Sequence, residues 1–84
     1  MNYSIEILKA AQKQLGKIQG SEQEKIVSEV RALSVNPRPL GCIKLRGRDA
    51  WRIRSGDYRI IYEIKDSTLA VIVIAIGHRR EIYR

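Results

Sequence analysis

The segment "AWRIRSGDYRIIYEI" at residues 50–64 decides the fold, because it consists of two strand-like halves around a tight turn. Aromatic and β-branched side chains, which favour strands, fill both halves, and Ser55-Gly56-Asp57 separates them. Strands joined by so short a connection pair in antiparallel fashion. The segment therefore predicts a β-hairpin within a larger sheet.

The sheet extends on both sides of this hairpin. "CIKLRG" at residues 42–47 and "TLAVIVIAIG" at residues 68–77 also have strand character, and short turn segments separate them from the hairpin. The second run is apolar on both faces of a strand. We therefore expect it in a central position, with helices packed on one side of the sheet.

The N-terminal residues predict one further strand and a first helix. "NYSIEI" at residues 2–7 alternates polar and apolar side chains, which is the period of a half-buried strand. Apolar residues then recur at helical spacing over residues 8–18, and Gly20 can end this helix.

A second helix follows and completes the order of elements. Its apolar stripe spans residues 26–33, and Ser21 with Glu24 forms a capping box at its start. The prolines of "NPRP" at residues 36–39 end it. We expect an α+β fold in the order strand, helical hairpin and four-stranded antiparallel meander.

Composition limits the architecture and the class of partner. The 84 residues, 44% of them hydrophobic, allow one domain over residues 1–84 with one modest core. The net charge is +7, of which residues 44–84 carry +5, and this favours a polyanionic partner such as nucleic acid, a ribosome or an acidic protein.

Cysteine content and hydropathy indicate the compartment. The single cysteine, Cys42, excludes an internal disulfide, and one histidine leaves no protein-only zinc site. The longest apolar run has eight residues, too few to cross a bilayer, and the N-terminus lacks the pattern of a secretion signal. We therefore expect a cytoplasmic protein without a metal.

Alternation along the strands places three arginines on one face of the hairpin. Arg52 and Arg54 point away from Trp51 and Ile53, and Arg59 joins them if the more apolar side of its strand faces the helices. Like charges clustered in this way repel one another, which indicates that an anion normally lies among them. Arginines are also common on the polar outer face of a basic sheet, and this simpler explanation stays open.

Further basic and aromatic residues flank this face. The preceding strand and loop place three of them at its margin: Lys44, Arg46 and Arg48. In "GHRREIYR" at residues 77–84, His78 and Arg79 follow the central strand and can reach over the sheet edge. Tyr83 beside these arginines suits single-stranded RNA, whose bases stack on rings, although a ring folded back onto the sheet stays possible.

The whole chain resembles the RelE toxins of bacterial and archaeal toxin–antitoxin pairs, within the RelE/ParE superfamily. The matching features are the order of elements, "NPRP" after the second helix, "KLRG" at residues 44–47, "WRIRSGDYRIIYEI" and the ending "IGHRREIYR". "GDYRIIYEI" followed about a dozen residues later by "IGHRREIYR" is a fairly specific combination.

The resemblance implies a microbial RNase-like fold and a ribosome-dependent endoribonuclease that cleaves mRNA in the ribosomal A site and stops translation. Cleavage in the family is an attack of a ribose 2′-hydroxyl on the adjacent phosphate, which leaves a 2′,3′-cyclic phosphate and a 5′-hydroxyl end. The family's catalytic positions correspond here to Arg52, Arg54, Arg59, Arg79 and Tyr83.

The resemblance also suggests roles. Arg59 and Arg79 would clamp the phosphate, and Tyr83 would stack on a base or accept the 2′-hydroxyl proton. His78 and Arg80 would contact the RNA, His78 as a donor facing phosphate rather than as a base. The best-known members carry lysines where this chain has Arg52 and Arg54, and since arginine cannot give up a proton, the general base stays open.

A toxin of this kind implies a cognate antitoxin. We expect it to be RelB-like and to lay an extended, acidic, amphipathic segment over the helices and the sheet edge. Ribosome and mRNA would be the other partners, and neither a membrane nor a cofactor is expected. Two other functions stay open: a ParE-like toxin that poisons DNA gyrase without nuclease activity, against which "HRREIYR" argues, and a basic binding module without activity.

Overall fold

The fold is built on one mixed sheet with two helices, and the computed structural model describes residues 2–78. The elements follow in the order β1 (Ser4–Ile7), α1 (Lys9–Gly16), α2 (Gly20–Ala32), β2 (Ile43–Lys44), β3 (Trp51–Ser55), β4 (Tyr58–Lys65), the 3₁₀ helix η1 (Asp66–Thr68) and β5 (Ala70–His78). The strands lie in the order β1-β5-β4-β3-β2. Only β1 and β5 pair in parallel within this part of the chain, so the expected α+β fold with an antiparallel meander is confirmed.

The hairpin of β3 and β4 forms where the sequence predicts it. Ser55 pairs with Tyr58, which leaves Gly56 and Asp57 as a two-residue turn. Gly56 has a φ of 63°, in the left-handed region that tight hairpin turns need and that glycine adopts without steric penalty. The turn thereby sets the register of the strands that carry the arginines.

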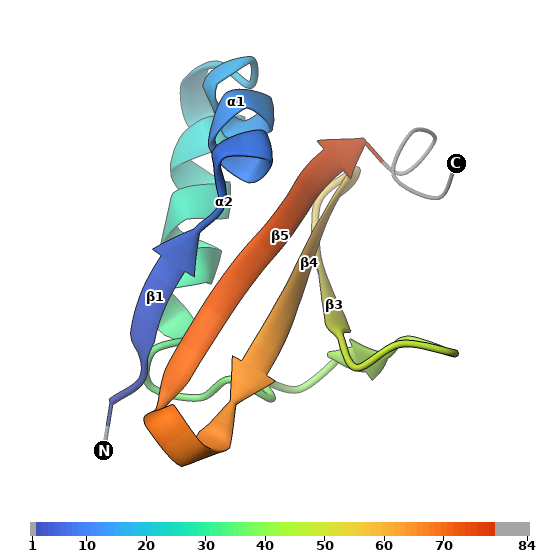
Figure 1. Cartoon of the computed structure of the whole chain (residues 1–84). Helices are drawn as coiled ribbons and strands as arrows, with labels where there is room; N and C mark the ends of the chain where they lie inside the picture. The colour runs from blue at the N-terminus through green and yellow to red at the C-terminus, as the bar shows by residue number, and fades with distance from the viewer. Residues whose placement is uncertain (1, 79–84) are drawn as a thin grey trace.

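Strand β5 occupies an interior position between β1 and β4, as its apolar character on both faces predicts (Figure 1). Its pairing with β4 is interrupted by a bulge. Ile61 pairs with Ala75 but Tyr62 pairs with Val73, so Ile74 is an extra residue in β5. A bulge of this kind reverses the alternation of faces beyond it. Val71 and Val73 lie in the core before the bulge, and Ile76 lies there after it.

The two helices lie on one side of the sheet, and the core lies between them and the sheet (Figure 1). The buried cluster comprises Ala11, Ile18, Ile26, Val30, Leu33, Ile53, Ile60, Tyr62, Ile64, Val71, Val73 and Ile76. Ile26, Val30 and Leu33 form the apolar stripe predicted for the second helix. None of the helices within residues 2–78 is long and apolar enough to cross a membrane.

The ends of the helices differ from the sequence prediction. Helix α1 ends at Gly16, and Gly20, with a φ of 67°, is the first residue of α2. Ser21 therefore lies inside α2, Gln19 occupies the N-cap, and no side-chain capping bond forms. The predicted capping box of Ser21 and Glu24 is wrong, because a glycine with positive φ can begin a helix after a short link as well as end the preceding one.

Candidate nucleic-acid interface

The strand register brings the three arginines of the hairpin onto one face. Arg54 lies directly opposite Arg59, and Arg52 lies opposite Ile61. Directly opposed residues of antiparallel strands share a face, and Ile53 and Ile60 on the other face belong to the core beneath the helices. The arginines therefore point away from the helices, as alternation predicts. We call Arg52, Arg54 and Arg59 the arginine face.

Arg59 differs from the prediction in its burial. The sequence suggests an open position, yet only 6% of Arg59 is exposed, whereas Arg54 opposite it is exposed. Arg59 lies on the interior strand β4, between β3 and β5, and Arg54 lies opposite it on β3.

The polar atoms of Arg59 are incompletely satisfied by residues 2–78. Its Nη1 donates to the Tyr58 carbonyl at 3.4 Å, and its buried Nε has no partner among these residues. Within the same part of the chain neither Arg54 nor Arg59 has an ion pair. A buried guanidinium with unused donors beside a second cation is suited to binding an anion, and its planar fork matches phosphate.

Lys44 does not lie at the margin of the arginine face, so this prediction is wrong. The register places Ile43 opposite Arg52 and Lys44 opposite Trp51, on the helix side of the sheet. The Lys44 ammonium lies 5.8 Å from the centre of the Trp51 ring and 3.6 Å from a carboxylate oxygen of Asp49. Strand β2 has only two residues, so alternation within it could not fix which of them faces the arginines.

The other predicted RNA contacts are distributed as follows. Arg46 and Arg48 are exposed in the loop between β2 and β3. His78 pairs with Tyr58 at the end of β5, where the bulge turns it toward the helix side, and the two rings meet edge to face at 5.7 Å. Three predicted site residues lie outside the described residues: Arg79, Arg80 and Tyr83.

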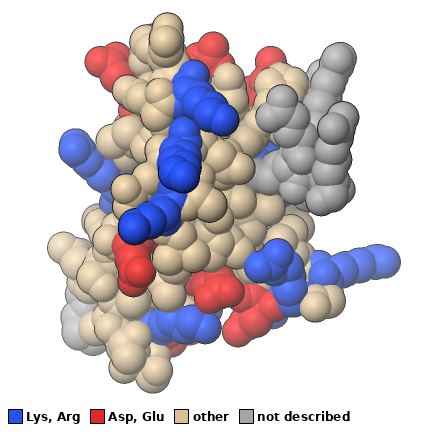
Figure 2. All heavy atoms as spheres, turned by 45° about the horizontal axis from the view of Figure 1, so that its top comes forward, with Lys and Arg blue, Asp and Glu red and all other residues tan. Residues whose placement is uncertain are grey.

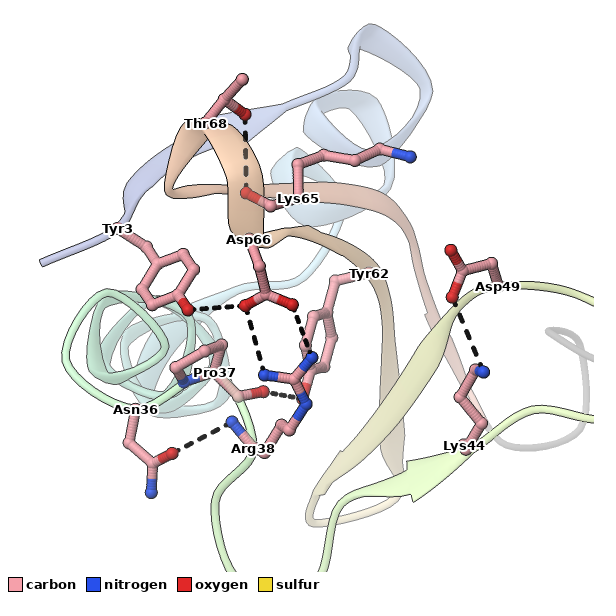
Figure 3. Close-up of polar contacts among 10 residues, drawn as sticks. All are labelled: Tyr3, Asn36, Pro37, Arg38, Lys44, Asp49, Tyr62, Lys65, Asp66 and Thr68. Atoms are coloured by element: carbon pink, nitrogen blue, oxygen red, sulfur yellow. Dashed lines mark hydrogen bonds and ion pairs between the residues drawn. The ribbon is translucent and has the colours of Figure 1, made fainter.

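A polar network around Arg38, whose "NPRP" segment predicts only the end of a helix, holds the opposite end of the sheet together (Figure 3). Its guanidinium binds Asp66 at 2.9 Å, and the Tyr3 hydroxyl donates to the same carboxylate at 2.7 Å. The Arg38 guanidinium also lies 5.3 Å from the centre of the Trp51 ring. The network therefore links Tyr3 before β1, Asp66 after β4 and Arg38 in the loop after α2 to Trp51 of β3.

These contacts shift the pKa values of two groups, Asp66 and Tyr3, in opposite directions. The guanidinium of Arg38, followed by the hydroxyl of Tyr3, lowers the pKa of Asp66. The hydrogen bond to the Asp66 carboxylate raises the pKa of the Tyr3 hydroxyl. Both shifts favour a charged Asp66 and a neutral Tyr3, which is the arrangement that makes all the observed hydrogen bonds.

The "NPRP" loop is fixed from the core side as well. The hydroxyl of the fully buried Tyr62 donates to the Pro37 carbonyl at 2.7 Å, and burial raises the pKa of this hydroxyl. Asn36 accepts a bond from the Arg38 backbone N–H at 3.1 Å, which closes a local turn. A single arginine between two prolines was the only sequence feature that could have indicated an anchored loop here.

The described part of the site favours binding and charge stabilisation over proton transfer. Guanidinium groups stay protonated, so the arginine face can neutralise a phosphate but supplies no base. Residues 2–78 contain no group of three His, Cys, Asp or Glu side chains placed to hold a metal ion. The arrangement can therefore hold an anion and stabilise charge that develops on it.

Comparison with known proteins supports the fold and identifies the family. The family described as the ParE toxin of the type II toxin–antitoxin system parDE matches residues 5–83. A RelE-like toxin protein of Escherichia coli is 28% identical over 82 residues, which cover 94% of this chain and 85% of that protein.

Solved structures give the same result. RelE in the archaeal RelE–RelB complex of Pyrococcus horikoshii is 26% identical, with a TM-score of 0.85 and coverage of 96% of this chain and 99% of that one. A chain of the intact RelBE toxin–antitoxin complex of E. coli is 29% identical, with a TM-score of 0.78 and coverage of 90% and 95%. This chain belongs to the ParE toxin family of type II toxin–antitoxin systems, within the RelE/ParE superfamily.

Proposed function

We propose that this toxin is a ribosome-dependent mRNA endonuclease whose arginine face holds the scissile phosphate in the ribosomal A site. The observation that carries the proposal is the buried Arg59 guanidinium, which lies opposite Arg54 and has an unused Nε donor within residues 2–78. Keeping such a cation in the sheet is unfavourable in the empty protein, and an RNA phosphate would offset this by accepting its hydrogen bonds.

The proposed reaction is an internal transfer at phosphorus. The ribose 2′-oxygen bonds to the adjacent phosphorus, the bond to the 5′-oxygen of the next nucleotide breaks, and the products are a 2′,3′-cyclic phosphate and a 5′-hydroxyl end. The 2′-hydroxyl proton passes to a base, for which Tyr83 is our choice, and the departing 5′-oxygen takes up a proton. Arg59 and Arg79 would hold the non-bridging oxygens, where negative charge accumulates.

Arginine at positions 52 and 54 gives the chain little acid–base capacity of its own. An enzyme equipped in this way depends on an accurately oriented substrate, which a ribosome provides. We therefore propose that free mRNA is cleaved poorly. The ribosome and mRNA as partners, and the cytoplasm as the place of action, follow from this proposal.

The antitoxin partner also has a candidate surface. An apolar groove of about 310 Å³ between β1 and the helices is lined by Ile5, Ile7, Leu15, Val27, Val30 and Arg31. An acidic, amphipathic antitoxin segment would place its apolar side chains in this groove and a carboxylate on Arg31, in keeping with the net charge of +7. The Pyrococcus and E. coli relatives were solved as complexes with RelB antitoxins.

The test is a cell-free translation reaction in which mRNA 5′ ends are mapped by primer extension. The wild-type chain should produce cuts within translated codons only when ribosomes are present. Arg59→Lys, Arg79→Ala and Tyr83→Phe should weaken these cuts, and Arg59→Lys retains the charge but loses the planar fork. Lys25→Ala, an exposed change on α2, serves as the control and should cleave normally.

The gyrase alternative predicts a different result. Intact mRNA and undisturbed translation in the presence of folded wild-type protein would refute the nuclease proposal. A gyrase supercoiling assay with the same preparation would then decide whether the chain acts as a gyrase poison. The arginine variants would in that case show no common loss of activity.

A further inference from the structure

A second basic surface lies on the helix side of the molecule, away from the arginine face. Lys9, Lys13 and Lys17 follow one another at intervals of four residues along α1 and its C-cap, and all three are exposed. That spacing puts them on one side of the helix, about 6 Å apart along its axis. Figure 2 shows a row of lysine and arginine side chains on the side of the molecule where α1 lies. We call these three residues the lysine row.

Helix stability does not account for the whole lysine row. Lys13 and Lys17 are near the C-terminal end of α1, where positive charge suits the helix dipole. Lys9 is the first residue of the same helix, where positive charge is unfavourable, and the first turn has no acidic residue. No acidic side chain lies anywhere in residues 9–17 to balance the row. Such a uniform charge suits a ligand with regularly spaced negative groups.

The lysine row leads to a pocket of about 450 Å³ at the end of the sheet. Six of its lining residues are Gln14, Lys17, Ile18, Tyr58, Ile76 and His78. The Gln14 side-chain oxygen accepts a hydrogen bond from the Ile76 backbone N–H at 2.8 Å, which fixes this wall against β5. The pocket is large enough for a nucleotide.

The walls of this pocket suit a nucleobase. Tyr58 and His78 meet edge to face with their rings 83° apart, so the two rings present surfaces in different directions. Ile18 and Ile76 supply apolar contact, and Lys17 at the end of the lysine row supplies a cation for the adjoining phosphate. Rings beside a track of positive charge are the usual means of binding single-stranded nucleic acid.

The strand register connects this pocket to the arginine face. Tyr58 pairs with His78, and the next pair along the same two strands is Arg59 with Gly77. Tyr58, which lines the pocket, and the buried Arg59 are thus neighbours along β4, and their side chains lie on opposite sides of the sheet.

We propose that the pocket between α1 and the ends of β4 and β5 binds one nucleotide of single-stranded RNA, and that the lysine row binds the phosphates that follow it. This site presupposes the proposed RNA substrate but not its cleavage. It extends the RNA footprint from the arginine face to the helix side of the molecule. The chemistry recognised is a base with its phosphate, followed by a sugar–phosphate backbone.

A binding assay with the full-length chain tests the lysine row. The probe is a fluorescein-labelled hexauridylate, titrated by anisotropy at 50 and 200 mM salt. The salt slope is the slope of the logarithm of the affinity against the logarithm of the salt concentration, and removing two phosphate contacts should reduce its magnitude by about 1.4. Between 50 and 200 mM salt, the affinity of the wild type should therefore fall about sevenfold more than that of Lys13→Ala/Lys17→Ala. Lys25→Ala/Lys65→Ala removes the same charge from other exposed positions and should keep the wild-type slope.

A second measurement tests the pocket. Adenosine 5′-monophosphate added to ¹⁵N-labelled protein should shift the backbone amide signals of Lys17, Ile76 and Gly77. Gln14→Ala, which removes one wall, should weaken this binding at least threefold while the unfolding midpoint is followed as a control for folding. Shifts confined to β3 and to Arg59 would overturn the proposal.

The remaining outcomes separate this inference from the proposed function and from a protein ligand. Ribosome-dependent cleavage together with an unchanged salt slope in Lys13→Ala/Lys17→Ala would overturn the RNA track alone. No cleavage, with the expected slope and shifts, would overturn the nuclease alone and support the RNA site. If the binding of hexaglutamate requires Lys13 and Lys17 but the binding of hexauridylate does not, the surface binds an acidic protein and the inference is wrong.

Discussion

Replacing Arg59 with methionine should stabilise the fold and abolish mRNA cleavage. Methionine retains the unbranched apolar stem but removes a cation that is 6% exposed and directly opposite Arg54. Opposed side chains begin about 5 Å apart, and two charges about 6 Å apart at an effective dielectric constant near 20 repel by about 3 kcal/mol. Because Arg54 is exposed, water and salt screen part of this repulsion, while removal of a buried charge adds a further gain.

The expected increase in the free energy of unfolding is therefore about 1–3 kcal/mol, measured by urea denaturation at constant ionic strength. Each kcal/mol corresponds to a rise in Tm of about 4–8 °C for a domain of this size. Arg54→Met is the matched comparison, and it should stabilise less, because Arg54 is exposed and has less burial to relieve. Inorganic phosphate should raise the Tm of the wild type more than that of Arg59→Met.

The opposite result would refute this reasoning. If Arg59→Met lowers the free energy of unfolding by about 1 kcal/mol or more, the guanidinium stabilises the folded chain even without a bound anion. Loss of cleavage in such a variant would then report on folding. Stabilisation combined with loss of cleavage is the pattern of a functional site whose residues oppose folding.

Two further predictions concern the opposite end of the sheet. Tyr62→Phe leaves the Pro37 carbonyl without its buried donor and should lower the free energy of unfolding by about 1–2 kcal/mol. Urea denaturation measures this change, and the m-value should stay the same. An effect below about 0.3 kcal/mol would mean that water replaces the hydroxyl. Because Arg38 and Tyr3 lower the pKa of Asp66, its carboxylate stabilises the fold above about pH 4, and this contribution is lost as the pH falls through the lowered pKa. Asp66→Asn should therefore lose less stability than the wild type between pH 5 and pH 2 in urea titrations, and parallel curves would contradict this.

The arginine face was predictable because β3 and β4 are regular strands of five and eight residues with a two-residue turn. Period-2 alternation then fixes which side chains share a face, without knowledge of the rest of the fold. Burial of Arg59 was not predictable in the same way. Alternation assigns a side chain to a face of the sheet but does not give its exposed fraction, which depends on tertiary packing.

Lys44 and His78 show where alternation fails. Strand β2 is too short to carry a pattern, so the side on which Lys44 lies depends on its pairing with Trp51. The bulge at Ile74 lies in a run that is apolar on both faces, so no polar residue marks the reversal that turns His78 toward the helices. The prediction of where α2 starts was wrong for a local reason, because Gly20 could equally end one helix or begin the next.

The bulge at Ile74 also lets β5 tolerate the loss of one codon at this point. Without Ile74, Ala75 would follow Val73 directly, and the existing partners in β4 would form an uninterrupted ladder in which Ile76 stays in the core and His78 stays on the helix side. Each remaining side chain would keep its partner across the sheet. A single in-frame deletion at the bulge would therefore leave the chemistry of both faces in place, whereas the same deletion inside the regular strand β4 would exchange the faces beyond it.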